Sequence, residues 1–296
     1  MPPEPSIAPV PGTGAHVIVD GGRTDAVRTS SGRFLRLVSP PPRLLDALGG
    51  ASGGDGEAAE YAAALRATMS AREEEDAQRR WPGPRREVAL VGGGPIVDAT
   101  ADALTDWGAA VTRHTDGAAL LASVDGTADG DRENGATAGS RAEGAWPWGL
   151  VVAYADSPAE RGGWDRLDAL PSQGVAWLRA YREGENGFVD PICLSADDPG
   201  SAQVYRRRLA ASLVPRELDT WRRAAVADAP PSPAARMLLT SRLLTLALAW
   251  AQDSEALQGY RGTLWKLVPA TGTISEHPVL AYDPPSALDR QARQRV

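Results

Sequence analysis

Residues 88–117 read VALVGGGPIVDATADALTDWGAAVTRHTDG, and this stretch decides the fold expected of the chain. An apolar strand over 88–91 leads into three glycines, and a helix with apolar residues every three or four positions follows over 96–107. A second short strand comes next, over 109–113. Nucleotide-binding βαβ units begin in this order, so the stretch predicts a Rossmann-type parallel sheet.

The sequence after this stretch predicts an α/β domain over 87–285. The continuous apolar runs at 148–156 and 174–184 are typical of buried parallel strands. Between and after them, helices are expected over 202–213, 215–224 and 231–253, so the parallel sheet should be covered on both faces. We expect a closing hairpin over 262–280, a mobile loop over 124–145, where apolar periodicity is absent, and a frayed tail over 286–296.

The first part of the chain predicts a separate, small α+β module over residues 16–80. Three short strands are expected within 15–38, separated by glycine-containing turns. A short helix follows within 40–50, and a longer one over 56–80 has one apolar and one charged face. Together these elements suggest a winged-helix-like module. The proline-rich residues 1–15 are expected to be disordered.

Composition excludes several classes of protein. The chain has 296 residues and a formal net charge of −7, which argues against general nucleic-acid binding. Its single cysteine, Cys193, excludes an internal disulfide framework and a zinc site of the CxxC type, so we expect no metal. The apolar stretch 237–250 is expected to be too short for a membrane span. With no signal peptide visible, we expect a cytoplasmic protein.

The glycine loop departs from the dinucleotide-binding pattern. Gly92 and Gly94 fit the tight turn, but Val97 replaces the small residue that lets helix and strand approach closely. Pro95 removes one N–H group from the helix start, where a phosphate would bind. Asp116 is the acid nearest the position expected for ribose binding. We therefore interpret the loop as vestigial and expect no bound cofactor.

No other group of residues predicts an active site. Cys193 has no histidine near it in sequence, and the three histidines (His16, His114 and His277) lack metal-ligand spacing. The pair Asp197–Asp198 is expected to cap the following helix. The chain's only lysine, Lys266, lies far from the glycine loop in sequence, so no lysine is placed to offset a triphosphate. We expect no catalytic residue.

The order and texture of the segments resemble a known family. The segments in question are RFLRLVSPPPRLLDALGG (33–50), the glycine-loop stretch, GVAWLRAYREGENGFVDPICLSADDPGSAQVYRRRLAASLVPRELDTW (174–221) and TGTISEHPVL (271–280). They resemble the E1/ThiF-like (ocin-ThiF-like) partner proteins of azoline-forming YcaO cyclodehydratases, which help to make thiopeptides and related thiazole/oxazole-modified peptides. The resemblance implies a degenerate E1/ThiF-like second domain, and it covers about 16–285.

In that family the first module is a recognition element that binds the leader of a ribosomal precursor peptide as an added strand. The resemblance therefore implies that 33–38 is the receiving strand, that residues of the long helix line a groove, and that arginines pair with an acidic leader. The implied peptide-binding residues are Arg33, Phe34, Leu35, Arg36, Leu37, Val38, Tyr61, Leu65, Arg66, Met69 and Arg72.

The resemblance implies a scaffold subunit that is not catalytic alone. It would present the Cys/Ser/Thr core of the precursor to a separate YcaO enzyme, which uses ATP. The apolar helix over 237–250 is expected to lie in the core, and two alternatives are a homodimer interface and a docking surface for the enzyme. Two alternatives stay open: an NAD(P)- or ATP-dependent enzyme using Gly92–Gly94, and a winged-helix DNA-binding regulator, against which the acids of the long helix argue.

Overall fold

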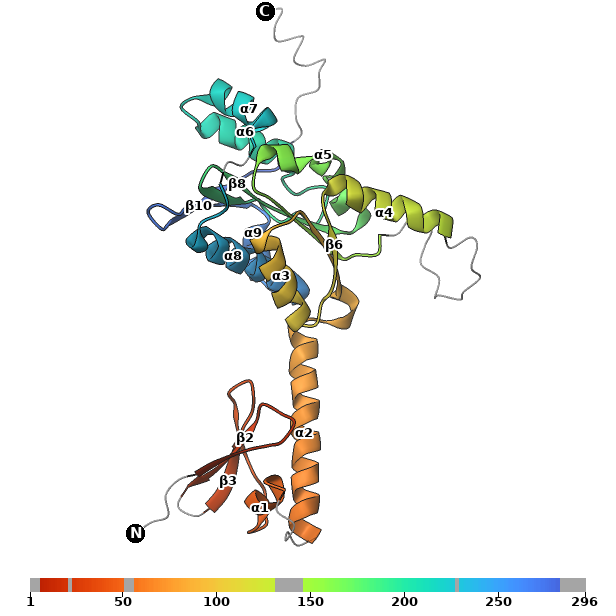
Figure 1. Cartoon of the computed structure of the whole chain (residues 1–296), viewed down its shortest axis with the longest axis vertical. Helices are drawn as coiled ribbons and strands as arrows, with labels where there is room; N and C mark the ends of the chain where they lie inside the picture. Colours follow the sequence, from red (N-terminus) through yellow and green to blue (C-terminus); the bar gives the residue numbers. More distant parts are fainter. Residues whose placement is uncertain (1–5, 21–22, 51–55, 131–145, 227–228, 283–296) are drawn as a thin grey trace, which may run out of the picture. The chain divides into compact units, whose positions relative to one another are not determined.

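The computed structural model describes residues 6–20, 23–50, 56–130, 146–226 and 229–282 (Figure 1). The chain divides into two compact units, Met1–Arg80 and Trp81–Val296. Each is described by itself. The expected disorder of residues 1–5, the part of the expected loop at 131–145 and the tail at 286–296 lie outside the described residues.

The first unit is an α+β module, drawn in red to orange in Figure 1. Four antiparallel strands lie in the order β1-β2-β3-β4, so β1 and β4 are the edges of the sheet. Apolar residues of the strands and of both helices form one core, which includes Val17, Leu44 and Met69. The elements are β1 (Ser6–Pro9), β2 (His16–Asp20), β3 (Arg23–Arg28), β4 (Phe34–Arg36), α1 (Leu44–Leu48) and α2 (Gly56–Arg80).

The N-terminus differs from the prediction, because part of the segment expected to be disordered is a strand. Ser6–Pro9 pairs with β2 along its whole length, from Ser6 opposite Val19 to Pro9 opposite His16. Val10, which follows β1, is fully buried. Prolines are compatible with an edge strand, where an N–H group facing away from the sheet is not needed. The proline-rich composition therefore concealed a strand.

The second unit contains a seven-stranded sheet of order β11-β10-β9-β8-β7-β5-β6. The strands are β5 (Glu87–Val91), β6 (Ala110–His114), β7 (Leu150–Ala155), β8 (Ala176–Glu183), β9 (Asn186–Val189), β10 (Thr263–Val268) and β11 (Thr273–Pro278). Strands β6, β5, β7 and β8 run parallel, as a Rossmann-type sheet requires. The α/β class is therefore confirmed.

The sheet is mixed rather than wholly parallel. After β8 the chain turns at Gly184, which has a φ of 59°, and returns as the antiparallel strand β9. Strand β10 pairs antiparallel with both β9 and β11, and the predicted closing hairpin is formed by β10 and β11. Three antiparallel strands thus extend the parallel half.

Helices cover both faces of this sheet, and alternate residues of its strands contact different cores. Val88 and Leu90 belong to the core that includes α3 and α8, whereas Ala89 and Val91 belong to the opposite core. The helices are α3 (Pro95–Asp106), α4 (Gly117–Gly130), α5 (Trp164–Leu167), α6 (Ser201–Ala211), α7 (Pro215–Ala224), α8 (Pro233–Ala251) and α9 (Ala256–Tyr260), with 3₁₀ turns η1 (Gly83–Arg85), η2 (Pro158–Arg161) and η3 (Leu170–Gln173).

Two expectations about helices were wrong. The expected mobile loop began at residue 124, but α4 continues to Gly130. Apolar periodicity is weak there, and the helix start is fixed instead by Asp116, whose carboxylate accepts the N–H of Ala119 at 2.8 Å. The second error concerns α8, which has 19 residues and is long and apolar enough to cross a membrane. Eight of its residues are buried against the rest of the unit, as in a core helix.

Candidate functional site

A groove lies between strand β4 and helix α2 in the first unit; we call it the β4–α2 groove. Its volume is about 440 Å³. Eight of the eleven residues implied by the family resemblance line it: Leu35, Arg36, Leu37, Val38, Tyr61, Leu65, Met69 and Arg72. Three further lining residues were not anticipated, namely Val27, Ala64 and Thr68.

The apolar part of the groove follows from strand register and helix periodicity. Leu35 stands opposite the buried Val27 of β3, so both side chains lie on the same face of the sheet. On α2, Tyr61, Leu65 and Met69 recur every four residues and face that sheet. The hydroxyl of Tyr61 donates to the carbonyl of Val38 at 3.1 Å, which joins the helix to the chain just after β4.

Two arginines give the groove positive charge. Arg36 comes from β4 and Arg72 from α2, and both line the groove with Thr68 and Ala64. These last two are exposed positions one helical turn apart, next to the predicted Tyr61 and Leu65. That spacing is the signal by which they could have been found.

Three predicted residues lie outside the groove. Phe34 is on the opposite face of β4 from Leu35, with 65% of its surface exposed. Arg33 lies near Asp76, whose pKa is lowered chiefly by a hydrogen bond from Ser31 and also by the charges of Arg79 and Arg33. The Nε of Arg66 donates to the carbonyl of Ala62 at 3.3 Å. None of these three side chains lines the groove.

Strand β4 has an open edge beside the groove. Among the strands that the structure describes, it is the last of its sheet and pairs with β3 alone. It is shorter than the expected 33–38, because its pairing with β3 covers only Phe34–Arg36. An edge strand next to an apolar groove is the geometry that accepts an added peptide strand.

The glycine loop of the second unit has a structural reason for Gly92. A Cβ there would lie 2.2 Å from the carbonyl oxygen of Tyr154 on β7, and the φ of Gly92 is 117°. Its N–H donates to the carbonyl of His114 at 2.9 Å. Gly92 is therefore required by the close approach of β5, β6 and β7, whether or not a ligand binds.

A carboxylate lies close to the start of α3, where a pyrophosphate would bind in a dinucleotide site. Gly94 precedes α3 with a φ of 85°, and a Cβ there would be 4.0 Å from Oδ2 of Asp156. The other oxygen of Asp156 accepts from the hydroxyl of Tyr154 and from Nε of Arg182, both at 2.6 Å. The carboxylate nearest this turn is thus ion-paired with Arg182 of β8.

The remaining residue of the predicted vestigial loop, Asp116, caps α4 as described above. On the neighbouring strand β6, Arg113 forms an ion pair with Asp98 of α3. The one cation of that strand is thus already paired with a carboxylate. Loss of phosphate binding stays a prediction, supported by these contacts.

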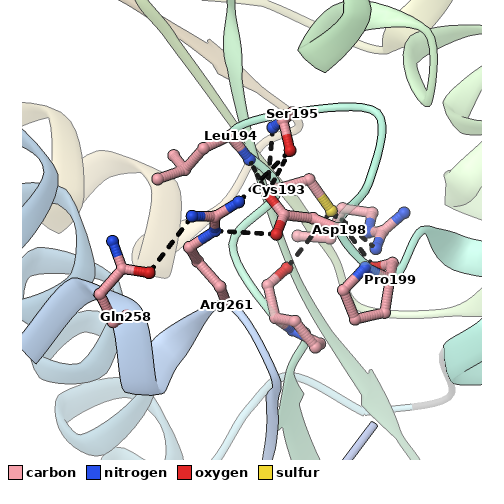
Figure 2. A network of polar contacts seen from close by, with 9 residues as sticks. Cys193, Leu194, Ser195, Asp198, Pro199, Gln258 and Arg261 are labelled. Carbon is pink, nitrogen blue, oxygen red and sulfur yellow. Dashed lines mark hydrogen bonds and ion pairs between the residues drawn. The ribbon is translucent and has the colours of Figure 1, made fainter. Parts of the chain in front are cut away.

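Cys193 pairs with Trp177 of β8 in an isolated β-bridge, and only 2% of its surface is exposed. Figure 2 shows it beside Pro199. Burial raises the pKa of its thiol to about 11, and Sγ lies 3.3 Å from the carbonyl oxygen of Pro199, to which the thiol donates. A protonated, buried thiol is a poor nucleophile. Cys193 is a core residue here.

Asp198 does not cap α6, contrary to the expectation for the Asp197–Asp198 pair. Its Oδ2 accepts the N–H groups of Leu194 and Ser195 at 2.7 and 3.0 Å, and its Oδ1 accepts from Nε of Arg261 at 2.8 Å (Figure 2). Instead, the first residue of α6, Ser201, donates to Asp168. The network of Figure 2 holds the 194–198 loop in place, and within it the hydroxyl of Ser195 also donates to Oδ2 of Asp198 at 3.5 Å.

His114 and His277 of the second unit lie on opposite edge strands of the seven-stranded sheet, β6 and β11. His114 packs edge-on against Trp148 with ring centroids 5.2 Å apart, and burial lowers its pKa. His16 begins β2 in the other unit, and Nε2 of His277 lies 3.0 Å from Oγ of Ser275. Within the described ranges, no three His, Cys, Asp or Glu side chains gather so as to hold a metal ion.

Comparison with known proteins gives distant similarities of fold. No protein-family model matches the chain, and no curated protein is significantly similar to it. A chain of the E. coli microcin synthetase McbBCD complex is 10% identical, with 96% of this chain and 100% of that chain covered and a TM-score of 0.44. The structure of the heterocyclase TruD is 13% identical over 100% of this chain and 43% of that chain, with a TM-score of 0.44.

The structure of E. coli MccB is a third such case, 9% identical over 70% of this chain and 65% of that chain, with a TM-score of 0.43. The chain spans less than half the length of TruD, and 37% of a second chain, described as a heterocyclase in complex with substrate and cofactor. Similarities this distant concern the course of the backbone and say nothing of what this chain binds or catalyses.

Proposed function

We propose that the protein captures the leader of a ribosomal precursor peptide on the open edge of β4 and presents its Cys/Ser/Thr core to a separate YcaO-type cyclodehydratase. The observation that supports this most directly is the β4–α2 groove beside an unpaired strand edge. The resemblance of the sequence to cyclodehydratase partner proteins supplies the kind of peptide.

The chemistry of the groove favours an acidic, partly apolar peptide. An added strand would form main-chain hydrogen bonds with β4, and every second side chain would face α2. Apolar side chains there would contact Leu35, Leu65 and Met69, while Arg36 and Arg72 would pair with carboxylates. The same geometry does not require a nucleotide or a catalytic residue in this chain.

A polarisation titration with the fluorescein-labelled leader of the precursor encoded beside this gene tests the proposal. Ala64 is an exposed groove residue, and Ala63 is an exposed neighbour on the same helix that does not line the groove. Ala64→Trp should fill the groove and weaken leader binding by about tenfold or more, which corresponds to about 1.4 kcal/mol. Ala63→Trp is the matched control, with the same added ring, and should bind as the unchanged protein does.

Absence of saturable leader binding would overturn the proposal, and so would equal binding by the two tryptophan variants. Presentation is tested separately, by mass spectrometry of the precursor incubated with the partner cyclodehydratase, ATP and this protein. Each azoline formed removes one water from the peptide, and Ala64→Trp should slow this loss while Ala63→Trp should not. If the leader binds but the precursor loses water equally fast without this protein, the proposal of leader capture is retained and the proposal of presentation to the enzyme is refuted.

A further inference from the structure

A second cavity lies in the other unit, between helices α6 and α7 and the antiparallel half of the sheet; we call it the α6–α7 cavity. Figure 1 shows the two helices side by side near β8 and β10. The cavity has a volume of about 620 Å³. Its wall includes three cationic residues, Arg207, Arg208 and Lys266, together with the carboxylate of Glu183. The proposed leader groove shares no residue with it.

Strand register brings residues from three strands to the floor of this cavity. Lys266 of β10 stands opposite Phe188 of β9, and Leu264 stands opposite His277 of β11. Residues directly opposite one another, or two apart on one strand, lie on the same face of a sheet. Leu264, Lys266, Phe188 and His277 therefore share the face that α6 and α7 cover. All four line the cavity.

Around Glu183 in the cavity wall, positive charges outnumber negative charges. Glu183 is nearly buried and forms a two-pronged ion pair with Arg208. Its Oε1 is also 3.5 Å from Nη2 of Arg161 and 3.6 Å from Nε of Arg222. The pKa of Glu183 is lowered overall. Burial raises it, but the hydrogen bonds and charge of Arg208, and then the charges of Arg222 and Arg161, lower it by more than burial raises it. One carboxylate thus serves three guanidinium groups.

The two outer cations have no carboxylate partner within the described part of the chain. Arg207 donates through Nε to the carbonyl of Pro278 at 3.3 Å, which leaves its charge unbalanced. Lys266, the only lysine of the protein, has its Nζ 6.0 Å from the ring centroid of Phe188. Both side chains are half-buried, so their charges are less screened than those of fully exposed residues.

The opposite wall of the cavity is apolar. It is formed by Leu218 and Trp221 of α7 with Ala211 of α6, and 38% of the Trp221 surface is exposed. A cavity of this size, with an apolar wall and a few converging charged groups, is typical of small-molecule sites, which measure about 300–1,000 Å³. The charged groups here call for a ligand with more than one negative charge.

We propose that the α6–α7 cavity binds a small organic anion with two or more phosphate or carboxylate groups, held by Arg207 and Lys266 in front of the Arg208–Glu183 pair. This site goes beyond leader capture. It lies on the opposite side of the sheet from α3 and α8, because Leu264 and Phe188 belong to the core on the other face. Arginine and lysine bind both carboxylates and phosphates, and parallel titrations with one anion of each kind distinguish the two.

Isothermal titration of the full-length protein with pyrophosphate and, in parallel, with citrate at constant ionic strength tests this site. At least one of the two should bind with a Kd below about 1 mM. Lys266→Gln and Arg207→Gln should each weaken that binding at least about fivefold, since each removes one full charge from the contact. Lys266→Arg keeps the charge and should retain most of the affinity.

Arg206→Gln is the matched control. Arg206 is on the same helix and stacks near the ring of Tyr282, 5.9 Å from its centroid, rather than lining the cavity. Binding of pyrophosphate alone would indicate a phosphate ligand, and binding of citrate alone a polycarboxylate. The proposal is overturned if neither anion binds with a Kd below about 1 mM. It is also overturned if Lys266→Gln and Arg207→Gln bind as Arg206→Gln does, with thermal unfolding used to confirm that each variant is folded.

Discussion

Gly92 illustrates how one residue of a familiar motif can be required for packing alone. Its positive φ of 117° is unfavourable for any residue with a Cβ, and the nearest atom to such a Cβ would be a backbone oxygen, that of Tyr154. A backbone atom of a buried strand cannot move aside as the end of a flexible side chain can. Gly93, in contrast, has nothing within 4 Å of the corresponding position.

Gly92→Ala should therefore lower the free energy of unfolding by about 2–4 kcal/mol, from strain and steric overlap. Gly93→Ala should change it by less than about 1 kcal/mol. Urea titrations followed by far-UV circular dichroism measure both values. Equal effects of the two substitutions would show that the loop is constrained by something other than the contact with β7.

Cys193 makes stability depend on pH in the alkaline range. Its pKa rises from an ordinary value of 9.0 to about 11 on folding, chiefly through burial. The folded state therefore holds the thiol proton more tightly than the unfolded state. Its contribution to stability is complete below pH 9 and is lost as the pH rises toward 11.

We expect the free energy of unfolding of the unchanged protein to fall more steeply between pH 9 and 11 than that of Cys193→Ala, which lacks this proton. Chemical denaturation at a series of pH values measures the difference in slope. The thiol should also react slowly with a disulfide reagent at pH 8 in the native protein and quickly in urea. Parallel pH profiles of the two proteins would contradict the assigned pKa.

At the level of elements, the parts predicted best were those whose signal is local. The run of apolar residues at 148–156 and the glycine loop with its helix are recognisable within one segment, and β7, β5 and α3 follow them closely. Strand β1 was missed because its four residues are stabilised by pairing with β2, not by their own composition. Strand β9 was likewise not predicted, since a four-residue segment has too little periodicity to identify.

The candidate site was predictable to a similar extent. The resemblance placed the groove between the third predicted strand and the long helix, and the four-residue spacing of Tyr61, Leu65 and Met69 brings these side chains together. Arg33 and Phe34 could not be placed from sequence, because the face of a strand that meets the core depends on register. The α6–α7 cavity depends on the register of three strands, so it was not predicted from the sequence.

At the level of the whole molecule, the chain combines two units with different chemistry. All the residues that line the β4–α2 groove belong to Met1–Arg80, and those that line the α6–α7 cavity belong to Trp81–Val296. The groove is suited to an extended peptide, and the cavity to a compact anion. Because the two sites share no residue, a substitution in one removes no contact from the other.

The two proposed binding events should therefore be thermodynamically independent. In the full-length protein, Lys266→Gln should leave the Kd for the leader within about twofold of the unchanged value, and Ala64→Trp should do the same for the anion. Four titrations, of each ligand with each variant, measure this directly. A leader affinity that changes by the same factor when the anion is added as the anion affinity does when the leader is added would instead reveal reciprocal coupling between the sites. In that case the anion would be a regulator of peptide capture, and independence would be refuted.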